Sequence, residues 1–396
     1  MTRVNKYDTY KDSGIEWVGE IPTTWQKVRL RFLCNIQTGD KDTVNKVDDG
    51  MYPFYVRSPI VERINTYTFD GEAILTAGDG VGAGKVFHYV TGKFDYHQRV
   101  YNLHNFKRIF GKFLYLYLKE NFYKEIEKSN AKSTVDSIRL PMLLNFPVVF
   151  PVDTVEQQVI ADYLDKKCGE IDKVVETEKA VIEKLKEYKQ SIITEVVTKG
   201  LDKSVPLKDS GIEWIGKIPE HWEVCRLKNY AKIQNGQDFK SVENDNGSIP
   251  VIGSGGEFAR ANEWLYHGES ILLGRKGTID KPLYVNCAFW TVDTMYYTQL
   301  ENITFGKYFY YLCKTINFDF YQYGSAVPSM TQRDLNSVRF PLPKKDEQRQ
   351  IADYLDNKCS EIDKVISDKE QLIEKLTEYK KSLIYECVTG KRKVVA

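Results

Sequence analysis

A glycine-rich stretch behind a short apolar run is the first place where residue types suggest chemistry. It reads TAGDGVGAGK over residues 76–85 and follows the apolar residues 73–75. A phosphate loop has the spacing G-x-x-x-x-G-K-[ST], whose backbone N–H groups cradle phosphates. That spacing would require glycine at Asp79, and Lys85 is followed by Val86 instead of Ser or Thr. The stretch is therefore no phosphate loop, and its glycines allow close backbone approach to another molecule.

Other patterns of catalytic or metal-binding residues are missing from the sequence. The five histidines show neither H-E-x-x-H nor paired ligand spacing, so we expect no zinc site. The tetrapeptides N-P-P-Y and D-P-P-Y, which position an adenine amino group for methyl transfer, do not occur. A glycine-rich strand-to-helix turn for S-adenosylmethionine does not occur either. We predict a protein that is not an enzyme and binds no metal.

Composition limits the class of protein further. The chain has 396 residues, which favours two or more domains, and a formal net charge of +1, which lacks the basic excess of a protein that coats nucleic acid. Its seven cysteines are scattered without a C-x-x-C pair, which is typical of free thiols in a reducing compartment. The polar N-terminus and the absence of a long apolar run predict a cytoplasmic protein.

The chain repeats itself. The segment KDSGIEWVGEIPTTWQKVRL at Lys11 returns as KDSGIEWIGKIPEHWEVCRL at Lys208. A second pair is EQQVIADYLDKKCGEIDKVV at Glu156 and EQRQIADYLDNKCSEIDKVI at Glu347. Between these segments the two copies share only a skeleton, such as GEAIL at Gly71 and GESIL at Gly268. We infer a unit of signature, variable region and charged helix that occurs twice.

The two charged segments predict long amphipathic helices. Leu164, Ile171, Leu185 and Ile192 stand seven or fourteen residues apart, and other faces carry Lys and Glu. Each apolar stripe needs a partner, and the other copy provides one in a two-stranded coiled coil. The second variable region lies between the end of one helix and the start of the other, so the helices should run antiparallel with the variable domains at opposite ends. Both chain termini should lie close together.

This order of segments resembles the specificity subunits of type I restriction-modification enzymes. The resemblance rests on D-S-G-I-E-W-[VI]-G-x-I-P-x-x-W before each variable region and on E-Q-x-x-I-A-D-Y-L-D at the start of each helix. FPVVFPVDTVEQQ at Phe146 departs from FPLPKKDEQR at Phe340, which affects the expected start of the first helix. The predicted fold class is α+β: two mixed α/β target-recognition domains separated by an antiparallel two-helix coiled coil, with an internal pseudo-two-fold repeat.

The resemblance implies a function and a domain division. Each target-recognition domain would read one half of an asymmetric, interrupted double-stranded DNA sequence. Two modification subunits, which methylate adenine, would dock on the helices, and restriction subunits would join them. S-adenosylmethionine, Mg and ATP would then be bound only by partner subunits. We expect the first recognition domain in residues 1–150, the first spacer helix in 151–200, the second domain in 201–343 and the second helix in 344–396.

Candidate DNA contacts combine glycines with side chains that reach base edges or phosphates. Hairpin loops with solvated charges, cross-strand polar faces and helix N-caps remain alternative explanations for them. In the first domain they are Arg57, Ser58, Thr76, Gly78, Gly80, Lys85, His97, Gln98, Arg99, Lys132 and Ser133. In the second domain they are Ser254, Gly255, Arg275, Lys276, Thr278, Thr294, Tyr323 and Ser325.

Candidate contacts with a partner subunit are aromatic. We expect the signature tryptophans to pack against the helix ends, and a role in partner binding is the alternative for some of them. The candidates are Trp17, Trp214, Tyr163, Tyr188, Tyr354 and Tyr379. Two rival functions stay open: a coiled-coil scaffold with two peptide-binding ends, and the recognition half of a split single-chain restriction enzyme. Divergent loops on a common skeleton favour a DNA reader over a scaffold.

Overall fold

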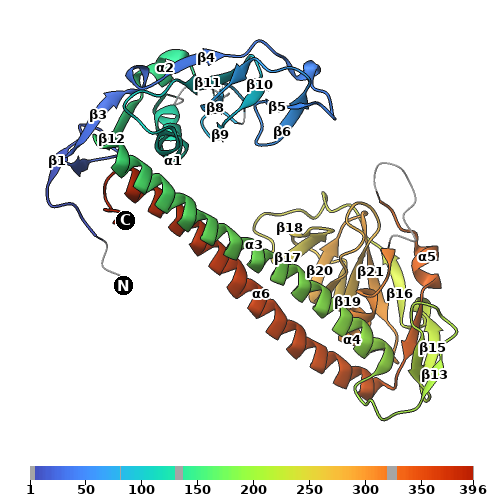
Figure 1. The fold of residues 1–396 in the computed structure, drawn as a ribbon. Helices are drawn as coiled ribbons and strands as arrows, with labels where there is room; N and C mark the ends of the chain where they lie inside the picture. Colours follow the sequence, from blue (N-terminus) through green and yellow to red (C-terminus); the bar gives the residue numbers. More distant parts are fainter. Residues whose placement is uncertain (1–4, 81, 130–136, 319–327, 396) are drawn as a thin grey trace. The chain divides into compact units, whose positions relative to one another are not determined.

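The computed structural model describes residues 5–80, 82–129, 137–318 and 328–395, which form two compact units (Figure 1). Unit 1 consists of Met1–Glu178 and Gln371–Ala396, and unit 2 of Lys179–Glu370. Both units are α+β and share most of their elements in the same order, as the sequence repeat predicts. No helix in these ranges is both long and apolar enough to cross a membrane.

Unit 1 contains a hairpin in its signature segment, followed along the chain by two four-stranded sheets. The hairpin is β1 (Tyr10–Asp12) with β2 (Glu20–Pro22), and β3 (Trp25–Arg29) pairs with β12 (Pro147–Pro151). One sheet has the order β4 (Asn35–Thr38), β11 (Val100–His104), β8 (Ala73–Ala77), β9 (Phe87–Val90). The other has the order β6 (Val61–Ile64), β5 (Tyr52–Tyr55), β10 (Lys93–Tyr96), β7 (Phe69–Asp70). Helices α1 (Gly111–Ser129) and α2 (Leu140–Asn145) and the short 3-10 turns η1 (Leu30–Phe32) and η2 (Thr43–Asn45) complete the unit.

Unit 2 builds the same scaffold with one six-stranded sheet. Its order is β16 (Ala231–Asn235), β21 (Met295–Leu300), β19 (Tyr266–Gly274), β20 (Leu283–Thr291), β17 (Ile249–Gly253), β18 (Gly256–Ala261). The hairpin β13 (Leu207–Asp209) with β14 (Lys217–Pro219) and the pair β15 (Glu223–Arg226) with β22 (Arg339–Leu342) match those of unit 1. Helices α4 (Gly306–Cys313) and α5 (Gln332–Ser337) and the turn η3 (Leu227–Asn229) correspond to α1, α2 and η1. The parallel pair β17–β20 corresponds to β5–β10.

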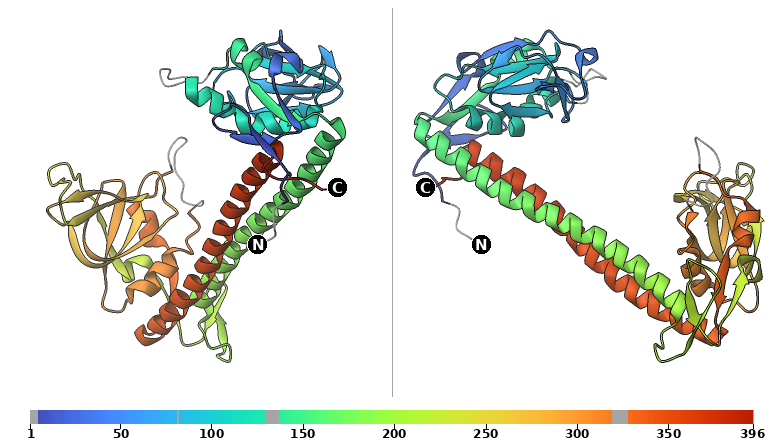
Figure 2. Two further views of the ribbon diagram at one scale, coloured as in Figure 1. Left: turned by 90° about the vertical axis from the view of Figure 1, so that its left-hand side faces the viewer. Right: turned by 45° about the vertical axis from the view of Figure 1, so that its right-hand side comes forward.

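The long helices are α3 (Thr154–Lys199) and α6 (Lys345–Val388), and they lie side by side in both views of Figure 2. In unit 1, Lys380 Nζ donates to Asp172 at 2.6 Å, and in unit 2 Lys189 Nζ donates to Asp363 at 2.6 Å. Residue numbers therefore rise along α3 while they fall along α6, and the prediction of an antiparallel pair is confirmed. Gly200 follows the end of α3 with a φ of +73°, as expected of a helix C-cap glycine.

Each hydrophobic core joins its sheet domain to both long helices. The unit 1 core contains Leu164 from α3 and Leu383 from α6 together with the fully buried Trp25. The unit 2 core contains Val197 and Leu355 in the same way. Because a buried side chain of this size contributes about 1.5–3 kcal/mol, each domain is anchored on its own helix segments. The contacts thus divide both long helices between the units, whereas the sequence pattern predicts each helix as a separate segment.

The two ends of the chain meet within unit 1. The backbone N–H of Lys393 donates to the carbonyl of Asn5 at 2.8 Å, which confirms that the termini lie close together. All seven cysteines are free thiols, as predicted. The placement of the two recognition domains at opposite ends of a rod concerns the relation between the units, and it stays a prediction.

Candidate nucleic-acid interface

The signature segments attach each sheet domain to a long helix in the same way. The Trp25 indole N–H donates to Glu156 in the first turn of α3 at 3.1 Å, and the Trp222 indole N–H donates to Glu347 in the first turn of α6 at 2.9 Å. Both indoles are buried, at 1% and 0% exposed. The prediction that signature tryptophans pack against helix ends is therefore confirmed for Trp25 and Trp222.

A buried glutamine beside each of these glutamates strengthens the attachment. Gln157 Oε1 accepts from the backbone N–H of Phe110 at 2.6 Å, and its Nε2 donates to the carbonyls of Pro151 at 2.8 Å and Arg108 at 3.2 Å. Gln348 makes the three matching bonds in unit 2. The repeated E-Q pair thus joins the helix start to the strand before it and to the loop before α1 or α4.

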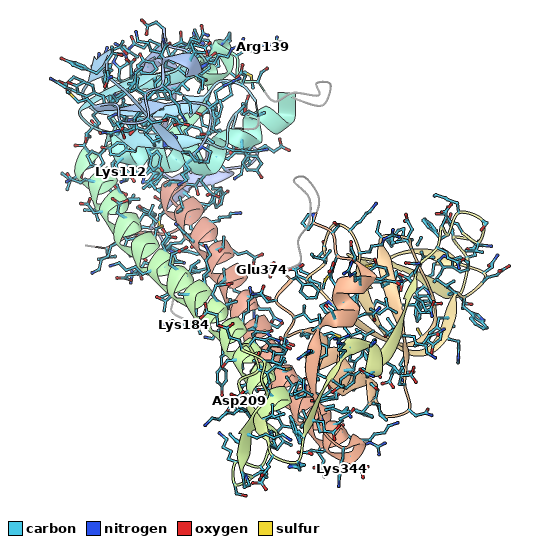
Figure 3. All side chains as sticks on the ribbon, turned by 90° about the vertical axis from the view of Figure 1, so that its right-hand side faces the viewer. Lys112, Arg139, Lys184, Asp209, Lys344 and Glu374 are labelled. Carbon is cyan, nitrogen blue, oxygen red and sulfur yellow. The ribbon has the colours of Figure 1, made fainter. Side chains whose placement is uncertain are left out.

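An ion pair adds a further link on the helix side of each sheet domain. Lys112 of α1, labelled in Figure 3, lies 3.1 Å from the Asp165 carboxylate of α3. Lys307 of α4 pairs with Asp356 of α6, whose other oxygen accepts from the Tyr311 hydroxyl at 2.9 Å. Within each unit, these hydrogen bonds and ion pairs fix the sheet domain, and with it the loops between its strands, to the long helices.

Loops that follow β5, β8 and β10 meet in unit 1 around one carboxylate. Arg57 Nη1 donates to Asp79 Oδ1 at 2.9 Å, and Arg99 Nη1 donates to Asp79 Oδ2. The hollow beside this cluster has a volume of 380 Å³ and is lined by Ser58 and Gly80 among others. The fold therefore brings four of the predicted DNA-contact residues, Arg57, Ser58, Gly80 and Arg99, together around Asp79.

The loop after β10, which contains Arg99, makes further polar contacts through Gln98 and His97. Gln98 Nε2 donates to Asp42 at 2.7 Å, and the backbone N–H of Arg99 donates to His97 Nδ1 at 2.9 Å. The His97 ring is 2% exposed, and burial lowers its pKa. A neutral His97 ring therefore accepts a hydrogen bond and fixes the backbone from which Arg99 projects.

In unit 2 the matching loops also meet, with different side chains. Lys276 forms a backbone bridge with Ser329, and Arg275 Nη1 donates to the carbonyl of Asp293 at 3.3 Å. The Arg275 guanidinium lies 5.9 Å from the centre of the Tyr296 ring. This end of unit 2 presents two adjacent cationic side chains.

The two units hold these loops with the same backbone hydrogen bonds. The Gly78 N–H donates to the Arg99 carbonyl at 2.8 Å, and the Arg275 N–H donates to the Thr294 carbonyl at 2.9 Å. Asp79 bridges Ser137 as Lys276 bridges Ser329. Three pairs of positions are therefore structurally equivalent but carry different side chains. They are Gly78 with Arg275, Asp79 with Lys276, and Arg99 with Thr294.

The predicted DNA contacts of unit 1 differ in their accessibility. Thr76 lies in β8 and Gly78 directly follows this strand, and both residues are buried. His97 is buried as well. Burial limits the access of a ligand to these three residues, and their contact with DNA stays a prediction. The exposed candidates are Arg57, Lys85, Gln98 and Arg99, and the half-buried ones are Ser58 and Gly80. Lys132 and Ser133 lie outside the described residues.

The candidates of unit 2 are all at least partly accessible where they are described. Lys276 and Gly255 are exposed, and half-buried positions are held by Ser254, Arg275, Thr278 and Thr294. Tyr323 and Ser325 lie outside the described residues. Contact of any of these residues with DNA stays a prediction.

The predicted partner contacts also divide by exposure. Tyr188 of α3 is 56% exposed, and Tyr354 and Tyr379 of α6 are exposed as well. Trp214 is exposed in unit 2, whereas its counterpart Trp17 is half-buried and stacks on Phe146. Tyr163 packs against the unit 1 core. The exposed members are available to a partner, and their role stays a prediction.

Asp79 and Asp42 are site residues that no sequence motif indicates. Asp79 lies in a glycine-rich stretch that was interpreted through its glycines, and Asp42 lies in a polar loop without a motif. One signal for Asp79 was its alignment with Lys276 in the second copy, because an acid and a base at equivalent positions indicate that the two loops differ in function. Among the residues whose placement is known, no group of His, Cys, Asp or Glu could hold a metal ion.

The family of this chain is established by a family model described as "Type I restriction modification DNA specificity domain". The model matches residues 22–187 and 219–376, which are the two repeat units and most of the chain. The chain belongs to this family. It is a specificity protein of type I restriction-modification systems and carries two DNA specificity domains, as the sequence motifs imply.

Curated relatives of this specificity protein support the assignment. The EcoDI specificity subunit of Escherichia coli is 28% identical over 54% of this chain, and the match spans 50% of that subunit's own length. The MjaVIII specificity subunit of Methanocaldococcus jannaschii is 26% identical, and the match covers 94% of both chains.

Two solved structures share the fold of this specificity protein. The HsdS subunit from Thermoanaerobacter tengcongensis matches 93% of this chain and 98% of its own, with 15% identity and a TM-score of 0.52. A chain from a study of assembly and conformational transition of the type I restriction-modification system matches with 14% identity and a TM-score of 0.74, over 93% of this chain and 98% of its own. At these identities the likeness shows the fold alone.

Proposed function

We propose that this specificity protein directs a type I restriction-modification complex to an asymmetric, bipartite double-stranded DNA sequence. Each unit would read one half-site, and the helix pair would set the number of skipped base pairs between them. A duplex presents equivalent groove faces about 34–36 Å apart, so two readers on one frame suit an interrupted target.

The observation that carries this proposal is the pair of equivalent loop frames with unlike side chains. The backbone bonds at Gly78 and Arg275 are the same, whereas Asp79 in one unit is replaced by Lys276 in the other. A scaffold with two peptide-binding ends has no need for such a difference on identical frames. Two readers of different half-sites require it, because base edges are recognised by side-chain donors and acceptors.

Partners would supply the chemistry in this proposal. The equivalent exposed tyrosines Tyr188 and Tyr379 recur on the two helices, which suits two copies of one methyltransferase subunit. S-adenosylmethionine would be bound by those subunits, and Mg and ATP by the restriction subunits that join them. The net charge of +1 fits a protein that binds DNA tightly only within such a complex.

Exchange of one recognition domain tests the proposal. Residues 31–150 are replaced by the corresponding region of a relative, and methylated adenines are mapped across a genome that expresses the complex. We expect only one half of the methylated sequence to change. The matched control replaces residues 228–343 and should change only the other half. A change of both halves, or of neither, in either chimera contradicts the assignment.

A further inference from the structure

Two guanidinium groups in unit 1 share one carboxylate at the end of the sheet domain. Arg57 and Arg99 each donate through Nη1, and they do so to different oxygens of Asp79. The Asp79 side chain is 19% exposed, whereas those of Arg57 and Arg99 are 45% and 61% exposed. The acid is therefore the inner member of the cluster, and the two bases are the outer ones that a ligand meets first.

Two backbone hydrogen bonds at Gly78 hold the main chain beside the cluster. The N–H of Gly78 donates to the Arg99 carbonyl at 2.8 Å, and the N–H of Ile138 donates to the Gly78 carbonyl at 2.7 Å. A Cβ at position 78 would lie 2.9 Å from the Arg99 carbonyl oxygen, which shows how closely the two loop backbones approach each other. Both ends of the Asp79–Arg99 ion pair thus start from fixed backbone positions.

The Asp79 carboxylate is ionised at neutral pH. Desolvation opposes its ionisation, but the hydrogen bonds and charges of Arg57 and Arg99 outweigh this effect and hold the Asp79 pKa below its ordinary value. A carboxylate that orients guanidinium groups lowers the entropy cost of aligning their planar donor forks. It also cancels part of their charge, which weakens attraction to phosphate in general.

The second unit lacks this arrangement at the equivalent positions. Ser254 stands where unit 1 has Arg57, Lys276 where it has Asp79, and Thr294 where it has Arg99. At these described positions the oriented arginine pair occurs in unit 1 and not in unit 2, so the two loop surfaces differ in chemistry.

A planar guanidinium with two free N–H groups matches the O6 and N7 acceptors of guanine in the major groove. We propose that Arg57 and Arg99 recognise guanine in the half-site of the first domain, with Asp79 as the positioning residue that orients both. This inference rests on the proposed function, since it names the base chemistry that one of the two readers takes.

The test uses the complete complex of this chain with its methyltransferase subunits. The probes are duplexes that contain the mapped methylation target with each base pair of both half-sites replaced in turn. We expect Arg57→Ala and Arg99→Ala to reduce the preference for a G·C pair by about 10-fold to 100-fold, at positions of one half-site only. The matched control, Lys276→Ala, should leave that half-site unchanged.

Asp79 is tested through its coupling to the arginines. Asp79→Asn should weaken the same G·C preference, Asp79→Glu should restore part of it, and Asp79→Asn should add little in a chain that already carries both arginine substitutions. If an alanine variant fails to fold, Arg57→Lys replaces it in the test. Lysine keeps the positive charge but lacks the planar donor fork, so the G·C preference should still fall.

Three outcomes decide the matter. A loss of G·C preference confined to one half-site supports the inference. Unchanged preference at every position in the arginine variants, or a change in the half-site that responds to Lys276→Ala, overturns it. A wild-type complex that methylates no bipartite sequence would instead contradict the proposed function, so the two failures are distinguishable.

Discussion

The buried glutamine at the start of α3 allows a quantitative test of how a sheet domain is attached to its helix. Gln157 is 0% exposed and makes three hydrogen bonds to backbone groups of Phe110, Pro151 and Arg108. Gln157→Leu keeps the approximate shape of the side chain and removes all three bonds. The bond to Pro151 is fully buried, and the other two are partly buried.

The magnitude follows from the groups that lose their partners. A buried donor or acceptor without a partner costs about 1–3 kcal/mol. The Arg108 carbonyl lies on an exposed residue and can bind water, so two backbone groups carry most of the penalty. Burial of the leucine side chain recovers about 1 kcal/mol. We therefore expect Gln157→Leu to lower the free energy of unfolding of unit 1 by about 1–5 kcal/mol.

Urea denaturation measures the global effect, and hydrogen exchange shows which unit opens. Gln158→Leu is the matched control, because Gln158 is the next residue of the same helix and is exposed; its effect should stay within about 0.5 kcal/mol. Gln348→Leu should repeat the loss in unit 2. A loss below about 1 kcal/mol, or one equal to that of Gln158→Leu, would refute the role assigned to this glutamine.

Three further predictions concern the helices and the thiols. Gly169 lies inside α3 with open space around its Cα, so Gly169→Ala should stabilise the protein by about 0.5–1 kcal/mol in thermal unfolding, and a loss of stability would show that the position is constrained. Lys189→Ala removes the ion pair with Asp363, which is more than half exposed, and should cost less than about 1 kcal/mol, with a smaller effect at high salt. Burial raises the pKa of the Cys34 and Cys387 thiols to about 12, so at pH 8 a thiol reagent should modify the exposed Cys287 first, and Cys287→Ser should abolish the fast phase.

The repeat and the helices could be predicted from the sequence because their signals are local or periodic. The spacing of Leu164, Ile171 and Ile192 depends only on the helix period, and the order of the segments is enough to infer antiparallel pairing. The glycine after α3 and the buried signature tryptophans follow from equally local rules of capping and hydrophobic burial. The proximity of the termini could likewise be predicted from the order of the repeated segments.

The candidate site was predicted only in part, because loops acquire their partners through the sheet. Arg57 and Arg99 were expected to contact DNA, but nothing in their spacing indicates that both donate to Asp79, which lies 22 and 20 residues away. His97 was expected to face a ligand, and the structure buries it behind Arg99.

The amino-acid sequence by itself determines two copies of one α+β unit, two long amphipathic helices and their opposite directions, because each of these depends on periodicity or on chain order. The tertiary structure alone decides which loop side chains meet at the end of each sheet domain. The pairing of β8 with β11 and of β5 with β10 converts distant sequence positions into neighbours. That pairing turns Asp79 from one acid in a glycine-rich loop into the centre of an arginine cluster.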